Sequence, residues 1–220
     1  MLLATSLLLG INWGTYIWAV SVNRILEASL GYYIAPLINI AFGVFVFRER
    51  LRKFQWLAVI LAAIGVIVIT IEYAALPWIA LVIAISWGTY ALLKKTLNLG
   101  ALQGLSIETA LAFPPYMIYL LWIEHQGKAQ FGAHLGFTLL LVSAGIITVV
   151  PLLLFNGAAT RLPLSITGLL QYIIPTIMFA IGTLVNHEPM SVGRIVGFAF
   201  IWAALTFLGI DLVRSNRSTT

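Results

Sequence analysis

Long apolar runs separated by short polar connections dominate the chain. A helix that crosses a bilayer needs about 20 mostly apolar residues. Eight runs fit that length, at approximately residues 1–22, 28–47, 53–73, 76–94, 104–123, 135–156, 164–185 and 192–213. Strands of a membrane β-barrel are about 10 residues long and alternate apolar with polar residues, which these runs do not. The pattern therefore predicts an all-α fold, a polytopic transmembrane bundle of about eight helices.

The composition supports a membrane protein. Hydrophobic residues make up 61% of the chain and charged residues 9%, whereas soluble domains carry about 25% charged residues, so lipid must cover most of the surface. Cysteine is absent, which excludes disulfides and thiolate metal sites. The net charge of +5 suits either a nucleic-acid-binding surface or cytoplasmic loops. Because the basic residues lie between apolar runs, the loops are favoured and no nucleic acid is expected.

The basic residues also predict an orientation. When the runs alternate across a bilayer, one side receives most of the basic residues, namely Arg48, Arg50, Arg52, Lys53, Lys94, Lys95, Arg161, Arg214 and Arg217. Cytoplasmic loops are enriched in Lys and Arg, so we expect this side to face the cytoplasm. Both termini are then cytoplasmic in a multi-pass protein of the bacterial inner (plasma) membrane.

One stretch occurs twice, 139 positions apart, at residues 33–49 and 172–188. Both copies begin with Tyr, have Pro at the fourth position and end on Glu, and 8 of the 17 positions are identical. The predicted orientation puts Glu49 inside and Glu188 outside, so the copies point in opposite directions. Inverted repeats of this kind are the architecture of secondary transporters.

Four further motifs carry a resemblance to a known family: Asn12-Trp13-Gly14-Thr15-Tyr16, Ser86-Trp87-Gly88-Thr89-Tyr90, residues 102–109 and residues 169–175. Together with the repeated Pro-to-Glu helix, they resemble the EamA half of the drug/metabolite transporter superfamily, and in detail its RarD branch. Members of that branch are known as chloramphenicol-sensitivity proteins and permeases. The resemblance implies an alternating-access permease that exports small metabolites or drug-like solutes.

The resemblance also implies a domain organisation. The family has ten helices in two inverted halves of five. By the repeat, residues 1–74 hold the last three helices of the first half, residues 75–215 hold the second half, and residues 216–220 form a cytoplasmic tail. The first two family helices then have no counterpart here. Two alternatives follow: a working permease, or a truncated, non-transporting membrane protein or subunit that requires a partner, either a second copy or a chain that supplies helices.

Uncharged polar and aromatic residues at mid-helix depth are candidates for a substrate cavity. They are Asn12, Tyr16, Tyr33, Asn39, Trp87, Tyr90, Asn156, Gln171 and Tyr172. Each can instead bond a neighbouring helix. The resemblance implies that the cavity-lining helices are those that carry Asn12, Asn39, Trp87, Asn156 and Gln171. Such an aromatic, weakly polar pocket suits an uncharged or amphipathic solute. The helix-end tryptophans are expected to be interfacial anchors, namely Trp13, Trp18, Trp56, Trp78 and Trp122.

Glu108 is the most notable ionisable residue, because it lies inside an otherwise apolar run. A charge in a spanning helix is costly and faces a cavity or a partner. Glu108 is therefore a candidate either for substrate binding or proton coupling, or for an ion pair with Lys94 or Lys95. Pro36 and Pro175 each remove a backbone hydrogen bond, so they are either hinges or ordinary membrane-helix prolines.

The remaining ionisable residues indicate structural roles. Glu49 and Glu188 lie at opposite membrane faces, and each is expected to cap the helix that follows it or anchor its loop. Asp211, the only aspartate, lies on the opposite side from the histidines, which excludes a Ser/His/Asp triad. We therefore expect no enzyme, no metal site and no cofactor, because no metal-ligand spacing occurs among His125, His134 and His187. The expected partners are the lipid bilayer and an unidentified small solute.

Overall fold

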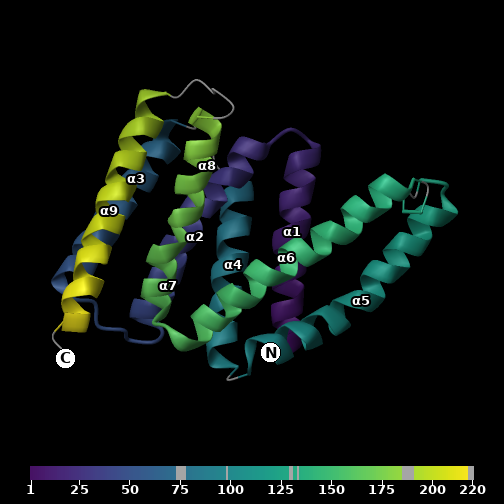
Figure 1. The fold of residues 1–220 in the computed structure, drawn as a ribbon, viewed down its shortest axis with the longest axis horizontal. Coiled ribbons are helices and arrows are strands. Elements are labelled where there is room, and N and C mark those ends of the chain that lie inside the picture. The colour runs from purple at the N-terminus through teal and green to yellow at the C-terminus, as the bar shows by residue number, and fades with distance from the viewer. Residues whose placement is uncertain (73–77, 98, 129–130, 133, 185–190, 218–220) are drawn as a thin grey trace.

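A computed structural model describes the chain except for residues 73–77, 98, 129–130, 133, 185–190 and 218–220. The described residues form nine α-helices and no strand. They confirm the expected polytopic helical bundle (Figure 1). The helices are α1 (Leu2–Ser21), α2 (Ile25–Phe45), α3 (Lys53–Glu72), α4 (Trp78–Thr96), α5 (Ala101–His125), α6 (Leu135–Arg161), α7 (Leu164–Gln171), α8 (Ile173–Leu184) and α9 (Val192–Arg217).

Six helices of the described chain are long and apolar enough to cross a bilayer: α1, α2, α3, α4, α6 and α9. The predicted span 104–123 lies in α5, which has 25 residues, contains Glu108 and the Pro114–Pro115 pair, and is not among these six. Its length of about 37 Å, at 1.5 Å per residue, nevertheless exceeds the thickness of the hydrocarbon core.

The predicted helical run over 164–185 is helical in its described residues except for a turn at one position. Gln171 ends α7, Tyr172 forms a turn, and α8 begins at Ile173. Pro175 has no N–H to bond the carbonyl of Gln171, so the backbone hydrogen bond that would join the two helices across Tyr172 cannot form. The other hinge candidate behaves differently, because α2 continues through Pro36.

The pair α3 and α9 packs through small residues. A Cβ added to Gly65 would lie 2.6 Å from the carbonyl oxygen of Gly197, and Ala58, Ala62 and Ala204 are fully buried. In a bilayer the hydrophobic effect does not drive helices together, because lipid tails are as apolar as the helices. Small residues let the two backbones approach closely, so van der Waals packing can hold the pair. The first residues of the two helices, Lys53 and Val192, are 139 positions apart, so the two helices are repeat equivalents that pack on each other.

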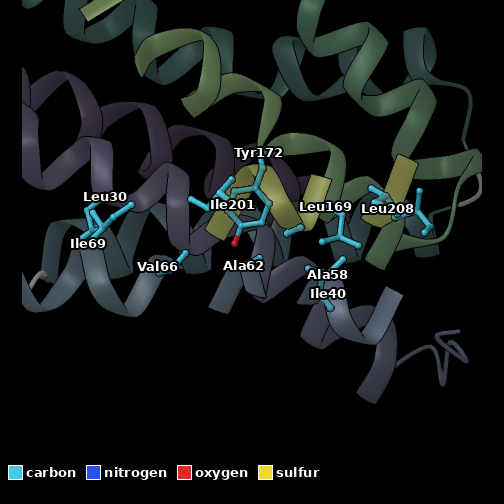
Figure 2. Close-up of a cluster of buried hydrophobic side chains, with 13 residues drawn as sticks. Leu30, Ile40, Ala58, Ala62, Val66, Ile69, Leu169, Tyr172, Ile201 and Leu208 are labelled. Carbon is cyan, nitrogen blue, oxygen red and sulfur yellow. The ribbon is translucent and has the colours of Figure 1, made fainter. Parts of the chain in front are cut away.

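The largest buried cluster joins this pair to α2 and α7. Figure 2 shows Tyr172 beside Ile201 of α9, with Leu169 of α7 further along the cluster and Leu30 of α2 next to Ile69 of α3. The Tyr172 hydroxyl donates a hydrogen bond of 3.2 Å to the backbone oxygen of Tyr33. These two tyrosines are 139 positions apart, so the equivalent points of the two repeats touch.

The connections α2–α3, α4–α5 and α6–α7 lie together at one edge of the bundle (Figure 1). This edge, which carries Arg52, Lys95 and Arg161, is called the basic end below. The beginning of α1 and the end of α9 lie at the same edge. The helices α5 and α6 form a hairpin that leans away from the other helices. Only 6% of the α6 span is buried, compared with 50% for α4, so α6 offers the larger surface to lipid or to a partner.

Candidate functional site

A pocket of about 320 Å³ lies between α1, α2, α4, α6, α7 and α8. None of its described lining residues is charged. Five aromatic rings form much of its wall, those of Trp13, Tyr16, Tyr32, Trp87 and Phe155. The other lining residues are Asn12, Ala35, Ile83, Thr148, Pro151, Leu152, Gln171 and Ile174. An apolar wall with a few polar groups is typical of a small-molecule site.

The wall of the pocket follows the sequence repeat. Ten of the lining residues form five pairs, and the members of each pair are 139 positions apart: Asn12 and Pro151, Trp13 and Leu152, Tyr16 and Phe155, Tyr32 and Gln171, Ala35 and Ile174. An accidental packing gap has no reason to obey the repeat. The pocket therefore lies where the two inverted halves face each other.

Ring contacts hold the aromatic wall in place. Trp87 lies 4.6 Å from Phe155 and 5.6 Å from Tyr90, measured between ring centroids. Tyr16 meets Tyr32 edge-on at 5.9 Å. These separations are in the range of favourable aromatic pairs, so each ring limits the side-chain rotation of its neighbour.

The structure brings four of the ten cavity candidates to the pocket: Asn12, Tyr16, Trp87 and Gln171. The other six lie outside its wall: Tyr33, Asn39, Tyr90, Glu108, Asn156 and Tyr172. Of these six, all but Tyr33 are buried in helix contacts. Hydropathy gives the depth of a residue but not the direction in which its helix face points.

Trp13 was predicted to be an interfacial anchor at a helix end, and that prediction was wrong, because Trp13 lies near the middle of α1 and lines the pocket. Sequence reasoning also missed Tyr32, Thr148 and Phe155. The repeat offset contained the missing signal, because adding 139 to Tyr16 gives Phe155 and subtracting it from Gln171 gives Tyr32.

A buried charged cluster lies between the pocket and the basic end. Glu108 is 1% exposed. Its Oε1 accepts from Lys94 Nζ at 3.1 Å, and its Oε2 lies 3.2 Å from the Tyr90 hydroxyl. Lys94 is also buried, and its ammonium contacts Gly104, where any side chain would displace it. Of the two expected ion-pair partners, the structure therefore assigns Lys94 to Glu108.

The Tyr90 hydroxyl has one proton but faces two acceptors. Besides Glu108, it lies 3.0 Å from Oδ1 of Asn156. Both contacts become hydrogen bonds if Glu108 carries a proton, or if the Asn156 amide turns so that its nitrogen donates to Tyr90. In the present arrangement that nitrogen has no partner among the described residues. The cluster thus accommodates two proton distributions with a small rearrangement.

Glu49 is a cap, but not of the helix that was predicted. Its carboxylate accepts from the backbone N–H groups of Leu164 and Ser165 at 2.7 and 2.9 Å, and from the Ser165 hydroxyl at 2.6 Å. Glu49 therefore caps α7 in the other repeat rather than α3, which follows it. Its repeat equivalent, Glu188, lies outside the described residues.

Lys95 completes this cap at the basic end. Its ammonium donates to Glu49 at 2.9 Å and to the backbone oxygen of Leu162, the residue that follows α6, at 2.8 Å. Burial alone would raise the pKa of Glu49, but the bonds from Ser165, Lys95 and Leu164 outweigh it and hold the pKa below its usual value. One carboxylate and one ammonium thus tie α4, α6, α7 and the α2–α3 connection together.

A second cross-helix cap lies at the opposite end. Glu27, which is 1% exposed, accepts from the backbone N–H of Ile79 at 3.0 Å and pairs with Arg24 at 2.7 Å. The hydropathy pattern gave no indication of this role for Glu27. Within the described part of the chain, no group of three or more His, Cys, Asp or Glu side chains is arranged to hold a metal ion.

An apolar helical bundle whose inverted repeats enclose an uncharged pocket is the architecture of a multi-pass membrane transporter. Family comparison agrees, because the model of the EamA-like transporter family matches residues 1–71 and 76–210. The chain belongs to this family.

Named relatives support the same assignment. Protein RarD of Streptomyces exfoliatus is 49% identical over 210 residues, which cover 95% of this chain and 67% of that protein. An uncharacterized transporter of Vibrio cholerae is 42% identical over 219 residues, covering 99% and 72%. Protein RarD of Escherichia coli is 44% identical over 221 residues, covering 100% and 75%. The chain is therefore similar to RarD proteins over nearly all of its own length.

Proposed function

We propose that the protein is a secondary transporter that exports small, uncharged or amphipathic solutes by alternating access. The observation that carries the proposal is the pocket, because ten of its lining residues form pairs that are 139 positions apart. In a transporter with inverted halves, the site shared by both halves stays fixed while the halves rock around it. The pocket is uncharged and aromatic, so its chemistry suits a weakly polar solute.

Two ion pairs support a closed gate at the basic end. Along α4, Trp87 faces the pocket, and Lys94 and Lys95 follow about 10 Å further on. These lysines bind Glu108 and Glu49, which hold α5 and α7 against α4. A path from the pocket to the basic end requires these contacts to separate.

The distribution of basic residues supports the membrane orientation. We assign the basic end to the cytoplasm of a bacterial inner membrane, with both termini on that side. For an exporter, solute then enters the pocket after the two ion pairs open and leaves on the opposite side. The chain in the present arrangement is therefore interpreted as closed towards the cytoplasm.

We also assign Glu108 as the proton carrier. Proton uptake removes the carboxylate charge that holds Lys94, and an uncompensated buried ammonium is costly. Protonation would therefore favour separation of α5 from α4 and hydration of Lys94. This assignment links a proton to the same contact that closes the pocket.

A second candidate is a membrane subunit that acts with another chain. The observation that favours it is the slight burial of the α5–α6 hairpin. A second copy or a helix-supplying partner would cover that face. Mass photometry in nanodiscs detects a second copy, because a dimer doubles the protein mass. If the species is a monomer and still transports solute, an obligatory partner is excluded.

The absence of cysteine allows a direct test of alternating access. The variant Thr148→Cys places one thiol in the pocket. A membrane-impermeant maleimide is applied separately to right-side-out and inverted vesicles. We expect labelling from the side opposite the basic end, and a shift of labelling to the basic end when Lys95→Met is added. Labelling that never shifts between sides would contradict alternating access, and simultaneous access from both sides would indicate a channel.

The same assay tests the proton carrier. With Thr148→Cys present, an imposed pH gradient should change the ratio of labelling from the two sides. Glu108→Gln should abolish that response, because its side chain cannot bind a proton, whereas the matched variant Glu124→Gln at the exposed end of α5 should retain it. An unchanged response in Glu108→Gln would remove Glu108 from this role. Comparison of intracellular and medium metabolites with and without the gene then addresses the natural solute.

A further inference from the structure

The amide of Gln171 has a defined direction in the pocket wall. Its Oε1 accepts from the indole N–H of Trp87 at 3.2 Å. An indole nitrogen only donates, so the oxygen rather than the nitrogen of Gln171 must face Trp87. The Nε2 group is therefore left as a donor, and it is buried without a partner among the described residues.

Asn12 has the opposite direction. Its Nδ2 donates to the backbone oxygen of Ile83 at 2.8 Å and to the Ser86 hydroxyl at 3.1 Å. A backbone carbonyl only accepts, so this amide orientation is also fixed by chemistry. Both N–H bonds of Asn12 are used, and its Oδ1 remains as an acceptor on a pocket-lining residue.

The two oriented amides come from different halves of the bundle. Asn12 lies on α1 and Gln171 at the end of α7, and both line the pocket. Their repeat equivalents, Pro151 and Tyr32, have different chemistry. The two amides thus place an acceptor on Asn12 and a donor on Gln171 at non-equivalent positions of the symmetric scaffold, which gives a bound molecule a preferred direction.

The rest of the wall selects against ions. None of the described lining residues is charged, and an ion that leaves water without a counter-charge is strongly disfavoured. The aromatic rings alone would also suit an organic cation. The N–H group of Gln171, however, presents the positive end of its dipole and disfavours a cation beside it.

We infer that the pocket recognises an uncharged aromatic amide, or a solute with the same pair of groups, whose carbonyl oxygen accepts from Gln171 and whose N–H donates to Asn12. This inference rests on the proposed function only in taking the pocket as the solute site. Asn12 and Gln171 are then the residues that determine specificity. The solute supplies an acceptor to Gln171 Nε2, which has no hydrogen-bond partner among the described residues.

A matched set of naphthalene probes tests the inference by equilibrium binding to the protein in nanodiscs. The set consists of tritiated 2-naphthamide and, as competitors, N,N-dimethyl-2-naphthamide, 2-naphthoate and a naphthylmethyl-trimethylammonium ion. We expect 2-naphthamide to bind most tightly. The dimethylamide has no N–H and should bind about tenfold more weakly, the loss expected for one hydrogen bond. Equal or tighter binding of either ion would overturn the inference.

Two variants assign the bonds to their residues. Gln171→Glu keeps an oxygen for Trp87 but replaces the free N–H by oxygen, so 2-naphthamide binding should weaken at least about tenfold. Asn12→Leu should remove the difference between 2-naphthamide and its dimethyl derivative, which a purely structural role would not do. Ile118→Leu, on the exposed surface of α5 and outside the pocket, is the control that should preserve the order of the probes. If the tenfold difference persists in Asn12→Leu, Asn12 is not the acceptor and the inference fails.

The outcomes separate this inference from the proposed function. If the thiol of Thr148→Cys shifts between the two sides but the uncharged amide is not preferred, alternating access stands and the polarity inference is wrong. If the amide is preferred with the expected variant effects but the thiol never shifts sides, the pocket is a binding site and the transport mechanism is wrong.

Discussion

The two copies of the Tyr-to-Glu repeat differ most at their prolines. In the first copy, α2 runs without interruption through Pro36, whereas in the second copy the helix breaks at Tyr172 before Pro175. Both prolines remove the same backbone hydrogen bond. The surroundings differ, because α2 is packed between α3, α4 and α7, while Ile173, Ile174 and Ile177 of the second copy are about half exposed.

This comparison shows that a proline does not determine a helix break by itself. Packing on several sides keeps α2 continuous, whereas the exposed surroundings of Ile173, Ile174 and Ile177 allow the turn between α7 and α8. The carbonyls that the prolines leave without their usual N–H belong to Tyr32 and Gln171, which are repeat equivalents and both line the pocket. The turn between α7 and α8 therefore adjoins one wall of the pocket, and the continuous helix α2 forms part of the other.

The largest effect is expected where the two copies cross. A Cβ at Gly168 of α7 would lie 2.7 Å from the backbone oxygen of Pro36. Gly168→Ala should therefore push α7 away from α2 and destabilise the fold by about 2–3 kcal/mol, as overpacking does. Gly157→Ala on α6 is the matched control, because an added Cβ meets nothing there. Thermal unfolding in detergent measures both, and equal stability of the two variants would contradict the observed helix crossing.

The next effect concerns the cap that the first copy provides for α7. Glu49→Gln should cost about 1–2 kcal/mol, because it weakens bonds to two backbone N–H groups and to Lys95. The folded-state pKa of Glu49 is lowered, so its stabilisation is fully present above the ordinary value of 4.5 and is lost as the pH falls through the lower folded-state pKa.

Unfolding measured against pH tests this dependence. The stability difference between wild type and Glu49→Gln should shrink on acidification below that range. Glu124→Gln, which changes an exposed carboxylate, should show no such convergence. A difference that stays constant through the acidic range would mean that the Glu49 charge does not stabilise α7.

The prolines themselves allow a paired test with a local effect. Pro175→Ala restores an N–H for the Gln171 carbonyl, so amide exchange around residues 172–176 should slow about tenfold, which corresponds to about 1.4 kcal/mol of local stability. Pro36→Ala should change exchange in α2 much less, since that helix is already continuous. Hydrogen–deuterium exchange measured by mass spectrometry compares the two variants. Equal slowing in both copies would refute the role assigned to packing.

The smallest effect is expected at the contact between equivalent tyrosines. Tyr172→Phe removes the hydroxyl that donates to the backbone of Tyr33, with a cost of about 1 kcal/mol. Tyr119→Phe, on an exposed surface of α5, should be neutral. Thermal unfolding of the two variants provides the measurement, and a neutral Tyr172→Phe would show that this bond does not hold the repeats together.

Part of the candidate site could be predicted from the sequence. Asn12, Tyr16, Trp87 and Gln171 were singled out and do line the pocket, because polar and aromatic residues at mid-membrane depth are few. Tyr90 and Asn156 satisfied the same criteria but point into a helix contact with Glu108. Depth follows from position along a helix, whereas the rotation of each helix about its axis depends on neighbours that are distant in the sequence.

The sequence by itself determined the class of fold, the repeat offset of 139 and the side on which the basic residues gather. Each of these is a local or periodic property, because membrane insertion depends on the summed apolarity of about 20 residues. The tertiary structure alone decided that Glu49 caps α7, that Lys94 rather than Lys95 pairs with Glu108, and that only the second proline accompanies a helix break. Those outcomes depend on which helices lie side by side, and helix packing joins residues that no window of sequence contains.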